Sequence, residues 1–404
     1  MFCRVTKACE HHTNVSEGVS IEDSKILLPS GQNILSLTQK WCHLLPDCVD
    51  SLAVSPSREV VAAGCENGQI ALLQVKSGQK SILGGHPGGV LCVQFSHCGE
   101  LLLTGGQDGR VRLWDVKEAR EIVSHLIEGV GAARGGEGSW VEHVACAPEG
   151  VHFAAAVGQS VFVFGRSSTG ELTVSMLEEL PSAVTGLAFL GDGKVAASGY
   201  LGVHVWNVTS LQDKPTLLPY RGSLTCFSSS PDGRWAVAGS QEASIRIWLL
   251  SNPSYALEMG GYGYKVTEMD WNDQNTLVTN GAAEPIVWDF SGAGPAGTTP
   301  VGCFGHSKSV TTIAFGRGGD VSPSILVSGS RDQLVLLWDV SQFEPGAPHR
   351  CRPLAGAIAP SARAIPNKVV CAAHGIVMVA YNYEAEVLAG GRIKGLCATI
   401  GTQL

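Results

Sequence analysis

The sequence has few charged residues and no local excess of positive charge. Charged side chains make up 16% of the 404 residues, and the net charge is −8. No run resembles the clusters of about five to eight Lys and Arg that mark phosphate-binding surfaces. The composition argues against binding of nucleic acid and predicts charges scattered over a solvated surface.

Long hydrophobic runs are also missing. The longest apolar stretch, Val369 to Ala380, contains His374 and Gly375 and is too short to span a bilayer. The first fifteen residues, MFCRVTKACEHHTNV, contain no apolar segment of the kind found in secretory signal peptides. We therefore expect neither a membrane association nor secretion.

The cysteines follow no regular framework. There are 13, an odd number, at irregular spacings, which is typical of a reduced protein with free thiols rather than of a disulfide scaffold. We expect a cytoplasmic protein, with a nuclear location as the alternative. Seven Cys and His residues near the beginning match no paired zinc framework, so no metal site and no cofactor is expected. They are Cys3, Cys9, His11, His12, Cys42, His43 and Cys48.

The dominant positive feature is a β run that recurs along the chain at intervals of about forty residues. Its copies include GRVRLWDV ending at Val116, LGVHVWNV ending at Val208 and LVLLWDV ending at Val340. The position of the aromatic residue is occupied in succession by Leu73, Trp114, Phe164, Trp206, Trp248, Trp288 and Trp338. This period, with four strand-like runs in each unit, predicts an all-β protein, a β-propeller of four-stranded antiparallel blades. Seven copies favour seven blades.

The ends of the chain leave the number of blades open. We expect a disordered tail over residues 1–24, a propeller over 25–340, and a C-terminal extension over 341–404 that contains a linker and a β-hairpin. In a seven-bladed ring, Ile34 to Trp41 would pair with Leu334 to Val340. In an eight-bladed ring, the hairpin of Lys368 to Cys371 and Gly375 to Tyr381 would join Ile34 to Trp41 and a further N-terminal segment, Ile26 to Leu28, in an additional blade.

Two repeats carry a complete set of four polar and aromatic side chains at matching spacings. Within each set, the Asp follows the hydroxyl residue by four positions and precedes the Trp by six. The sets are His86, Thr104, Asp108 and Trp114, and His306, Ser328, Asp332 and Trp338. On these residues the chain resembles the WD-repeat family over about residues 34 to 340.

The resemblance implies that each set is structural. In the family, the indole N–H donates to the hydroxyl, the hydroxyl bonds to His, and His bonds to the carboxylate, a chain that is consistent with the donors and acceptors available. The same residue types also form the hydrolase triad. The set occurs twice at repeat positions, however, and Trp stands where a triad would need an oxyanion-binding group. We therefore expect no catalytic residues and no enzyme.

The four strands of each repeat are lettered d, a, b and c in chain order. The family usually binds peptides or proteins on the face formed by the d–a and b–c loops. The chain is accordingly predicted to be an intracellular scaffold or adaptor that binds other proteins rather than small molecules. Aromatic and basic side chains dominate such interfaces. Those expected on this face are Trp140, Tyr220, Arg221, Tyr262, Tyr264, Lys265, Lys308 and Arg331.

Two alternatives remain open at this stage. One is a ligand or metal site in the central channel. The other is a substrate receptor of a ubiquitin ligase, a subclass that often carries Trp-Asp-x-Arg after strand c. Here Lys117 and Ser341 stand in place of that Arg, which weakens the second alternative.

Overall fold

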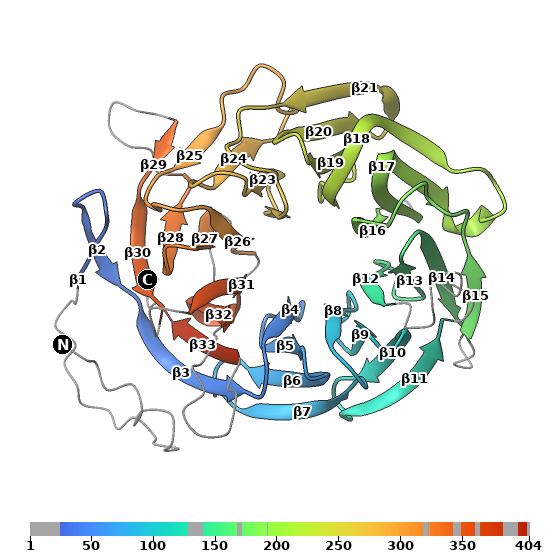
Figure 1. Ribbon diagram of the computed structural model, residues 1–404, viewed down its shortest axis with the longest axis horizontal. Coiled ribbons are helices and arrows are strands. Elements are labelled where there is room, and N and C mark those ends of the chain that lie inside the picture. The colour runs from blue at the N-terminus through green and yellow to red at the C-terminus, as the bar shows by residue number, and fades with distance from the viewer. Residues whose placement is uncertain are drawn as a thin grey trace.

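The computed structural model is a ring of β-sheets arranged around a central axis, here called the channel (Figure 1). It describes residues 25–127, 140–167, 172–191, 193–317, 322, 324–341, 349–359, 364–382 and 395–401. The tail expected over residues 1–24 lies outside these ranges. The strands form seven hydrogen-bonded sheets within the described residues, and one of these sheets comprises two blades.

The first three blades are regular four-stranded antiparallel sheets, whose strands a to d run from the channel outward. Blade 1 contains β4 (Val49–Val54), β5 (Val60–Cys65), β6 (Gln69–Gln74) and β7 (Lys80–Gly85). Blade 2 contains β8 (Val90–Phe95), β9 (Leu101–Gly106), β10 (Arg110–Asp115) and β11 (Arg120–Leu126). Blade 3 contains β12 (Val141–Cys146), β13 (His152–Val157), β14 (Ser160–Arg166) and β15 (Leu172–Met176).

Blades 4 and 5 share one long strand and therefore appear as a single six-stranded sheet. Its strands are β16 (Gly186–Leu190), β17 (Lys194–Asn207), β18 (Thr216–Ser229), β19 (Trp235–Ser240), β20 (Ile245–Leu249) and β21 (Asn252–Met259). The chain reverses within β17 at Leu201 and Gly202, which have φ of 71° and 134°. The residues that flank the two ends of β17 are hydrogen-bonded to each other: Val208 N donates to Gly193 O at 3.1 Å. The first half of β18 pairs with β17 in blade 4, and the second half pairs with β19 in blade 5. A 3-10 helix, η2 (Val208–Ser210), follows β17.

Blades 6 and 7 are extended at their outer edges by strands from distant parts of the chain. Blade 6 contains β22 (Met269–Trp271), β23 (Thr276–Thr279), β24 (Ile286–Asp289) and β25 (Val301–Cys303), to which β29 (Arg350–Cys351) adds in parallel. Blade 7 contains β26 (Val310–Phe315), β27 (Ile325–Ser330), β28 (Leu334–Asp339) and β30 (Pro353–Ile358). Two N-terminal strands, β1 (Lys25–Leu27) and β2 (Asn33–Ser36), add outside β30.

An eighth blade closes the ring. It contains β31 (Ile365–Cys371), the 3-10 turn η3 (Ala373–Gly375), β32 (Ile376–Asn382), β33 (Gly395–Gly401) and, as its outermost strand, β3 (Thr38–Leu45). Strand pairing thus gives eight blades, the alternative that the sequence left open, rather than the seven that the number of repeats favours. The repeats predict a propeller that ends at residue 340. The propeller continues beyond that residue, because β30 of blade 7 and three strands of blade 8 follow.

The pairing expected between Ile34 to Trp41 and Leu334 to Val340 is wrong. The partner of β28 is β30, and β2 lies one strand further out, in parallel with β30. The reason is the small side chains of β30. A Cβ atom on Gly356 would lie 2.7 Å from Leu336 and 2.9 Å from Ile34, so that glycine lets β30 fit between its two neighbours.

The core lies between neighbouring blades, and polar side chains of the inner strands fasten each blade to the next. Ser51 Oγ accepts a hydrogen bond from Val93 N at 3.1 Å, which joins blade 1 to blade 2. At the closure, Asn367 Nδ2 of blade 8 donates to Val49 O of blade 1 at 2.7 Å. These bonds satisfy backbone groups at the channel wall and hold the inner strands in a fixed order. No helix of the described residues has the length and apolarity to cross a bilayer.

Candidate functional site

Strand direction defines two faces of the ring. Since neighbouring strands in a blade are antiparallel, the d–a connections and b–c turns gather at one end, here called the top face. The a–b turns gather at the opposite end, here called the bottom face. All eight side chains proposed as partner-binding residues come from top-face connections.

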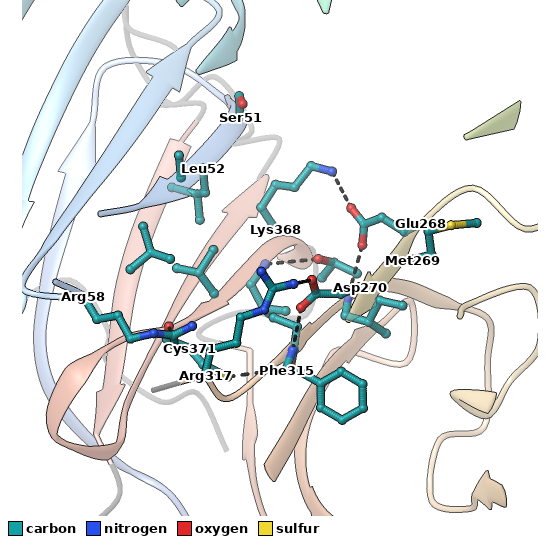
Figure 2. A pocket seen from close by; sticks show the side chains of 17 residues that line it. Ser51, Leu52, Arg58, Glu268, Met269, Asp270, Phe315, Arg317, Lys368 and Cys371 are labelled. Atoms are coloured by element: carbon teal, nitrogen blue, oxygen red, sulfur yellow. Dashed lines mark hydrogen bonds and ion pairs between the residues drawn. The ribbon is translucent and has the colours of Figure 1, made fainter. Parts of the chain in front are cut away.

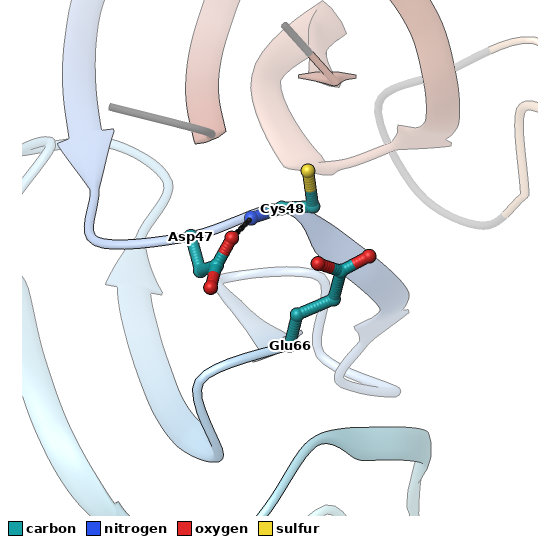
Figure 3. Close-up of side chains that lie close together, drawn as sticks. All are labelled: Asp47, Cys48 and Glu66. Atoms are coloured by element: carbon teal, nitrogen blue, oxygen red, sulfur yellow. Dashed lines mark hydrogen bonds between the residues drawn. The ribbon is translucent and has the colours of Figure 1, made fainter. Parts of the chain in front are cut away.

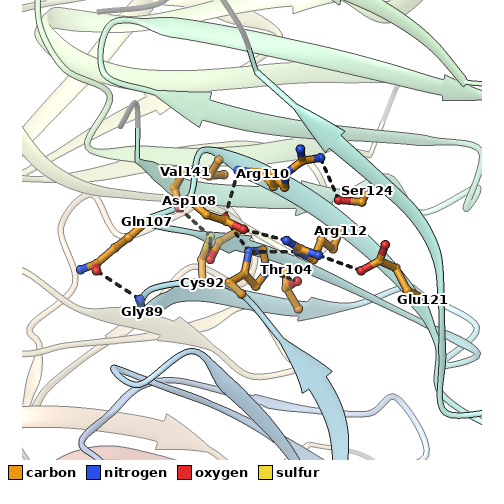
Figure 4. A network of polar contacts seen from close by, with 12 residues as sticks. Gly89, Cys92, Thr104, Gln107, Asp108, Arg110, Arg112, Glu121, Ser124 and Val141 are labelled. Carbon is orange, nitrogen blue, oxygen red and sulfur yellow. Dashed lines mark hydrogen bonds and ion pairs between the residues drawn. The ribbon is translucent and has the colours of Figure 1, made fainter. Parts of the chain in front are cut away.

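The set of four side chains in blade 2 forms a continuous chain of hydrogen bonds. Figure 4 labels two of its members, Thr104 and Asp108, together with Arg112, which bonds to Asp108. Trp114 Nε1 donates to Thr104 Oγ1 at 2.9 Å, and Thr104 Oγ1 lies 2.8 Å from His86 Nε2. His86 Nδ1 lies 2.8 Å from Asp108 Oδ1. Burial lowers the pKa of His86 and favours the neutral ring. The Asp108 carboxylate can only accept, so Nδ1 donates to it and Nε2 is the acceptor. Burial opposes ionisation of Asp108, but its bonds to Arg112 and His86 lower its pKa overall.

The set in blade 7 has the same bonding. Trp338 Nε1 donates to Ser328 Oγ at 2.9 Å, and His306 Nε2 lies 2.8 Å from the same oxygen. His306 Nδ1 lies 3.1 Å from both oxygens of Asp332. Ser328 and Thr104 are each 0% exposed. Both hydroxyls are therefore fully engaged in their blades, where no substrate can reach them.

Tyr262 takes the histidine position in blade 6. It precedes the buried residue Val266 by four positions, as His86 precedes Val90. Trp288 Nε1 donates to the Tyr262 hydroxyl at 2.9 Å, and that hydroxyl lies 2.8 Å from Thr279 Oγ1. Burial raises the pKa of Tyr262 to about 12. The phenol is thus bonded inside the blade, which differs from the expected role of Tyr262 as an exposed partner-binding residue.

Tyr220 occupies the corresponding position in blade 5, four residues before the buried Leu224. Its hydroxyl donates to Glu242 Oε2 at 2.9 Å, so a Tyr–Glu pair replaces the His–Asp pair of blade 2. Ala238 has no hydroxyl to offer, and Trp248 Nε1 instead donates to the backbone oxygen of Pro219 at 3.4 Å. The role of these two tyrosines is missing from the sequence-based prediction; the four-residue spacing to the first apolar residue of strand a, the same as from His86 to Val90, is the signal that could have indicated it.

The remaining candidates lie in the top-face connections of three consecutive blades, 5 to 7. Tyr264 N donates to Gly281 O at 2.7 Å, and the next residue, Ala282, accepts from Val310 N of blade 7 at 3.1 Å. In blade 7, Arg331 N donates to Ser309 O at 3.1 Å, beside Lys308. We call this set of residues the basic arc; it consists of Arg221, Tyr264, Lys265, Lys308 and Arg331.

The side chains of the basic arc are exposed, and Tyr264 is 59% exposed. Within the described residues, none of its four cations forms an ion pair. Trp140 is 50% exposed but precedes β12 in blade 3, so blade 4 separates it from the basic arc. The structure therefore exposes five of the eight predicted residues on three consecutive blades, leaves one on another blade and places two in blade networks.

A second feature lies in the channel wall, where β4, β22, β26 and β31 enclose a cavity of about 330 Å³ (Figure 2). Lys368 pairs with Glu268, and Arg317 pairs with Asp270. The two carboxylates also accept hydrogen bonds from blade 7, at 3.0 Å from Ile313 N and 2.8 Å from Phe315 N. These residues belong to no repeated motif, and no pattern in the sequence singled them out.

Three potential metal ligands lie close together at the top of blade 1 (Figure 3). One atom from each of Asp47, Cys48 and Glu66 lies within 4.8 Å of the other two, and Asp47 Oδ1 already accepts from Cys48 N at 2.9 Å. Burial and the charges of Glu66 and Asp47 raise the pKa of nearby Asp50 to about 6. Clustered acidic groups are by themselves no sign of a metal, and we assign no ion to this group.

Comparison with known proteins assigns the repeat. A family model described as WD domain, G-beta repeat matches residues 77–115, 214–248 and 298–339. Each matched segment begins near an outer strand and ends at or just after the Trp of strand c in the following blade. The chain belongs to the WD40-repeat β-propeller family.

Individual WD40 proteins resemble the chain over part of their length. The WD repeat-containing protein ATCSA-1 of Arabidopsis thaliana is 26% identical over 301 residues, 71% of this chain and 60% of the relative. The DDB1- and CUL4-associated factor 13 of Dictyostelium discoideum is 25% identical over 149 residues, 35% of this chain and 32% of the relative. The aligned part thus spans less than two thirds of either relative.

A solved structure supports the fold independently. The crystal structure of the computationally designed Ika8 protein superposes with a TM-score of 0.66 at 20% sequence identity. The superposition covers 91% of this WD40 chain and 99% of the designed protein. At that identity the similarity concerns the fold alone.

Proposed function

We propose that this WD40 propeller is a scaffold or adaptor without catalytic activity, and that it binds a protein partner through its top face. The observation that carries the proposal is the basic arc. It presents Tyr264, at 59% exposure, among four cations on three consecutive blades. An exposed aromatic side chain beside basic groups is the composition of a binding hot spot.

The charge of the basic arc favours an acidic partner segment. Arg221, Lys265, Lys308 and Arg331 have no carboxylate partners among the described residues. Carboxylates of a bound acidic segment would provide these partners. Such complementary charge raises the association rate and selects against basic partners. Such binding would weaken as salt rises, because exposed charges are screened beyond about 8–10 Å at physiological ionic strength.

The absence of catalysis is part of the proposal. The two Ser/Thr–His–Asp sets are the arrangement closest to a catalytic one, and their hydroxyls are fully buried and bonded to Trp. We also propose a cytoplasmic or nuclear location, with proteins rather than nucleic acids or small molecules as the partners of the top face. The cysteines of the described residues are free thiols, which supports a reducing compartment.

Affinity purification followed by mass spectrometry tests the proposal. The double variant Tyr264→Ala/Arg331→Ala is expected to lose at least one partner that the unchanged protein retains. A matched control, Tyr255→Ala/Lys76→Ala, removes an aromatic and a basic side chain outside the basic arc and should retain all partners. If both variants purify the same partners as the unchanged protein, the top-face assignment is refuted.

A second candidate function is substrate reception for a ubiquitin ligase. It is favoured by the similarity to the Dictyostelium protein, whose name states association with DDB1 and CUL4. It is weakened by Lys117 and Ser341, which stand where such receptors often carry Arg. Co-precipitation with DDB1 tests it directly. Lys117→Arg should strengthen an existing association, and the failure of both forms to bind DDB1 would reject this function.

A further inference from the structure

One bottom-face turn has an arginine at a position where three other blades have glycine. In blade 1, Arg58 N donates to Ser55 O at 2.8 Å, and Arg58 has φ of 61°. The equivalent residue is glycine in three other blades, with φ between 69° and 78°. These are Gly99, Gly150 and Gly233. Non-glycine residues rarely adopt this left-handed backbone, and such exceptions cluster at functional positions.

The Arg58 side chain lines the channel cavity (Figure 2). Arg58 Nη1 donates to Cys371 O of blade 8 at 2.9 Å, and Arg58 O accepts from Ala373 N at 3.0 Å. Arg58 is thus held against blade 8 at both its backbone and its side chain. A guanidinium has five N–H donors, and only one has a partner in the described residues.

The charged groups of the cavity leave one positive charge unbalanced. Lys368 is matched by Glu268, and Arg317 is matched by Asp270. Arg58 has no carboxylate at ion-pair distance in the described part of the chain. Its pKa is lowered chiefly by burial. The nearby charge of Arg317 acts in the same direction, and the charges of Asp273 and Asp270 act in the opposite direction. Two guanidinium groups, from blades 1 and 7, therefore line one cavity. Its charged lining residues carry one excess positive charge: they are Arg58, Arg317, Lys368, Glu268 and Asp270.

We propose that this bottom-face cavity binds a carboxylate group through Arg58, with Arg317 as the second donor. A single carboxylate balances the single excess charge, and its two oxygens suit the planar fork of guanidinium N–H groups. The carboxylate would belong either to an acidic peptide segment or to a free small carboxylic acid. This site lies at the end of the channel opposite to the basic arc and does not depend on the function proposed for the arc.

Isothermal titration of the full chain with two probes tests the site. The probes are succinate and an N-acetylated, C-amidated hexaglutamate peptide. Arg58→Gly removes the guanidinium and supplies the residue that the same turn has in other blades, so the fold is expected to persist. Its affinity for the bound probe should fall at least about tenfold, the loss of a charge-assisted hydrogen bond.

The matched control is Asn275→Gly, because Asn275 has φ of 58° in the corresponding bottom-face turn of blade 6 and contributes no cation. It should bind the probes like the unchanged protein. Binding of succinate alone identifies a free acid as the ligand class, and binding of the peptide alone identifies an acidic segment. Peptide affinity lost in Arg331→Ala but retained in Arg58→Gly would belong to the basic arc and would overturn the proposal.

Urea unfolding separates binding from a purely structural role of Arg58. If Arg58 only fastens blade 1 to blade 8, Arg58→Gly should change stability without changing probe affinity, and the proposal fails. Should that variant not fold, Arg58→Lys retains the positive charge but lacks the fork, and its loss of affinity supports the site. If neither succinate nor the peptide binds to the unchanged protein, the proposal is also refuted.

Discussion

Removing one hydroxyl should distinguish the two tyrosines of the Tyr262-Gly-Tyr264 segment, which lie only two residues apart. Tyr262→Phe keeps the ring and deletes the oxygen that accepts from Trp288 Nε1 at 2.9 Å. Thr279 Oγ1 retains Ile286 O as a partner at 3.3 Å. The substitution therefore leaves one buried donor, the indole N–H of Trp288, without a partner.

The expected loss follows from that single orphaned donor. Leaving a buried polar group unsatisfied costs about 1–3 kcal/mol of unfolding free energy. For a chain of this size the urea m-value is at least about 3 kcal/mol/M, so the unfolding midpoint should fall by roughly 0.3–1 M at constant m. Tyr264→Phe is the matched control, since Tyr264 is 59% exposed and its hydroxyl lies outside the blade. It should stay within about 0.5 kcal/mol of the unchanged protein.

The assay is equilibrium unfolding in urea, followed by tryptophan fluorescence and circular dichroism together. Coincident transitions are required before the midpoints are compared, because large proteins can unfold through intermediates. Equal midpoints for Tyr262→Phe and the unchanged protein would refute the assignment of Tyr262 to the blade network. A larger loss for Tyr264→Phe than for Tyr262→Phe would refute it as well.

Three further predictions concern the other blades. Thr104→Val should cost about 2–4 kcal/mol because Trp114 and His86 both lose a partner, whereas Thr104→Ser should cost only about 1 kcal/mol, as measured by urea unfolding. Asp50 has its folded-state pKa raised above the unfolded value, so its ionisation opposes folding as pH rises through the interval from 3.8 to about 6. Asp50→Asn should therefore add about 1–2 kcal/mol at pH 7.5, after allowance for solvent screening, and nothing near pH 4, as measured by thermal unfolding across pH. A chain that stops at residue 382 lacks β33 and leaves the facing edges of β3 and β32 unpaired, so size-exclusion chromatography should show more aggregate than for the full chain.

The repeated part of the fold could be predicted from the sequence because the signals that indicate each blade lie close together in the chain. Alternating strands, turn residues and a Trp at a constant spacing from Asp108 or Asp332 fix the blade and its hydrogen bonds. All of these signals lie within one repeat. They require no knowledge of what packs beside the blade.

The closure could not be predicted because its signals are weak and distant. The β30 segment Leu354-Ala355-Gly356-Ala357 has mostly small side chains. Their role is to let β30 fit between Leu336 and Ile34, which only the folded structure shows. The composition of that segment is the same as that of a linker. Its assignment to blade 7 depends on neighbours that the local sequence does not specify.

The functional residues divide in the same way. Exposure of Tyr264, Lys308 and Arg331 follows from their place in top-face loops, and the sequence predicts it. The role of Arg58 does not follow, because an isolated Arg in a turn has no pattern. It becomes visible only when its backbone is compared with Gly99 and its side chain is seen beside Arg317.

The manner of ring closure has a consequence for how the protein is made. Asn382 Oδ1 accepts a hydrogen bond from Val49 N, a residue 333 positions earlier in the chain. Strand β3 likewise pairs with β33, the last strand of the described chain. During synthesis, β3 leaves the ribosome early and has no edge to pair with until the last blade emerges. At about 5–20 residues per second, that interval lasts tens of seconds. The nascent chain therefore carries an unpaired strand for most of its synthesis, and the cell must keep that strand from pairing with other chains.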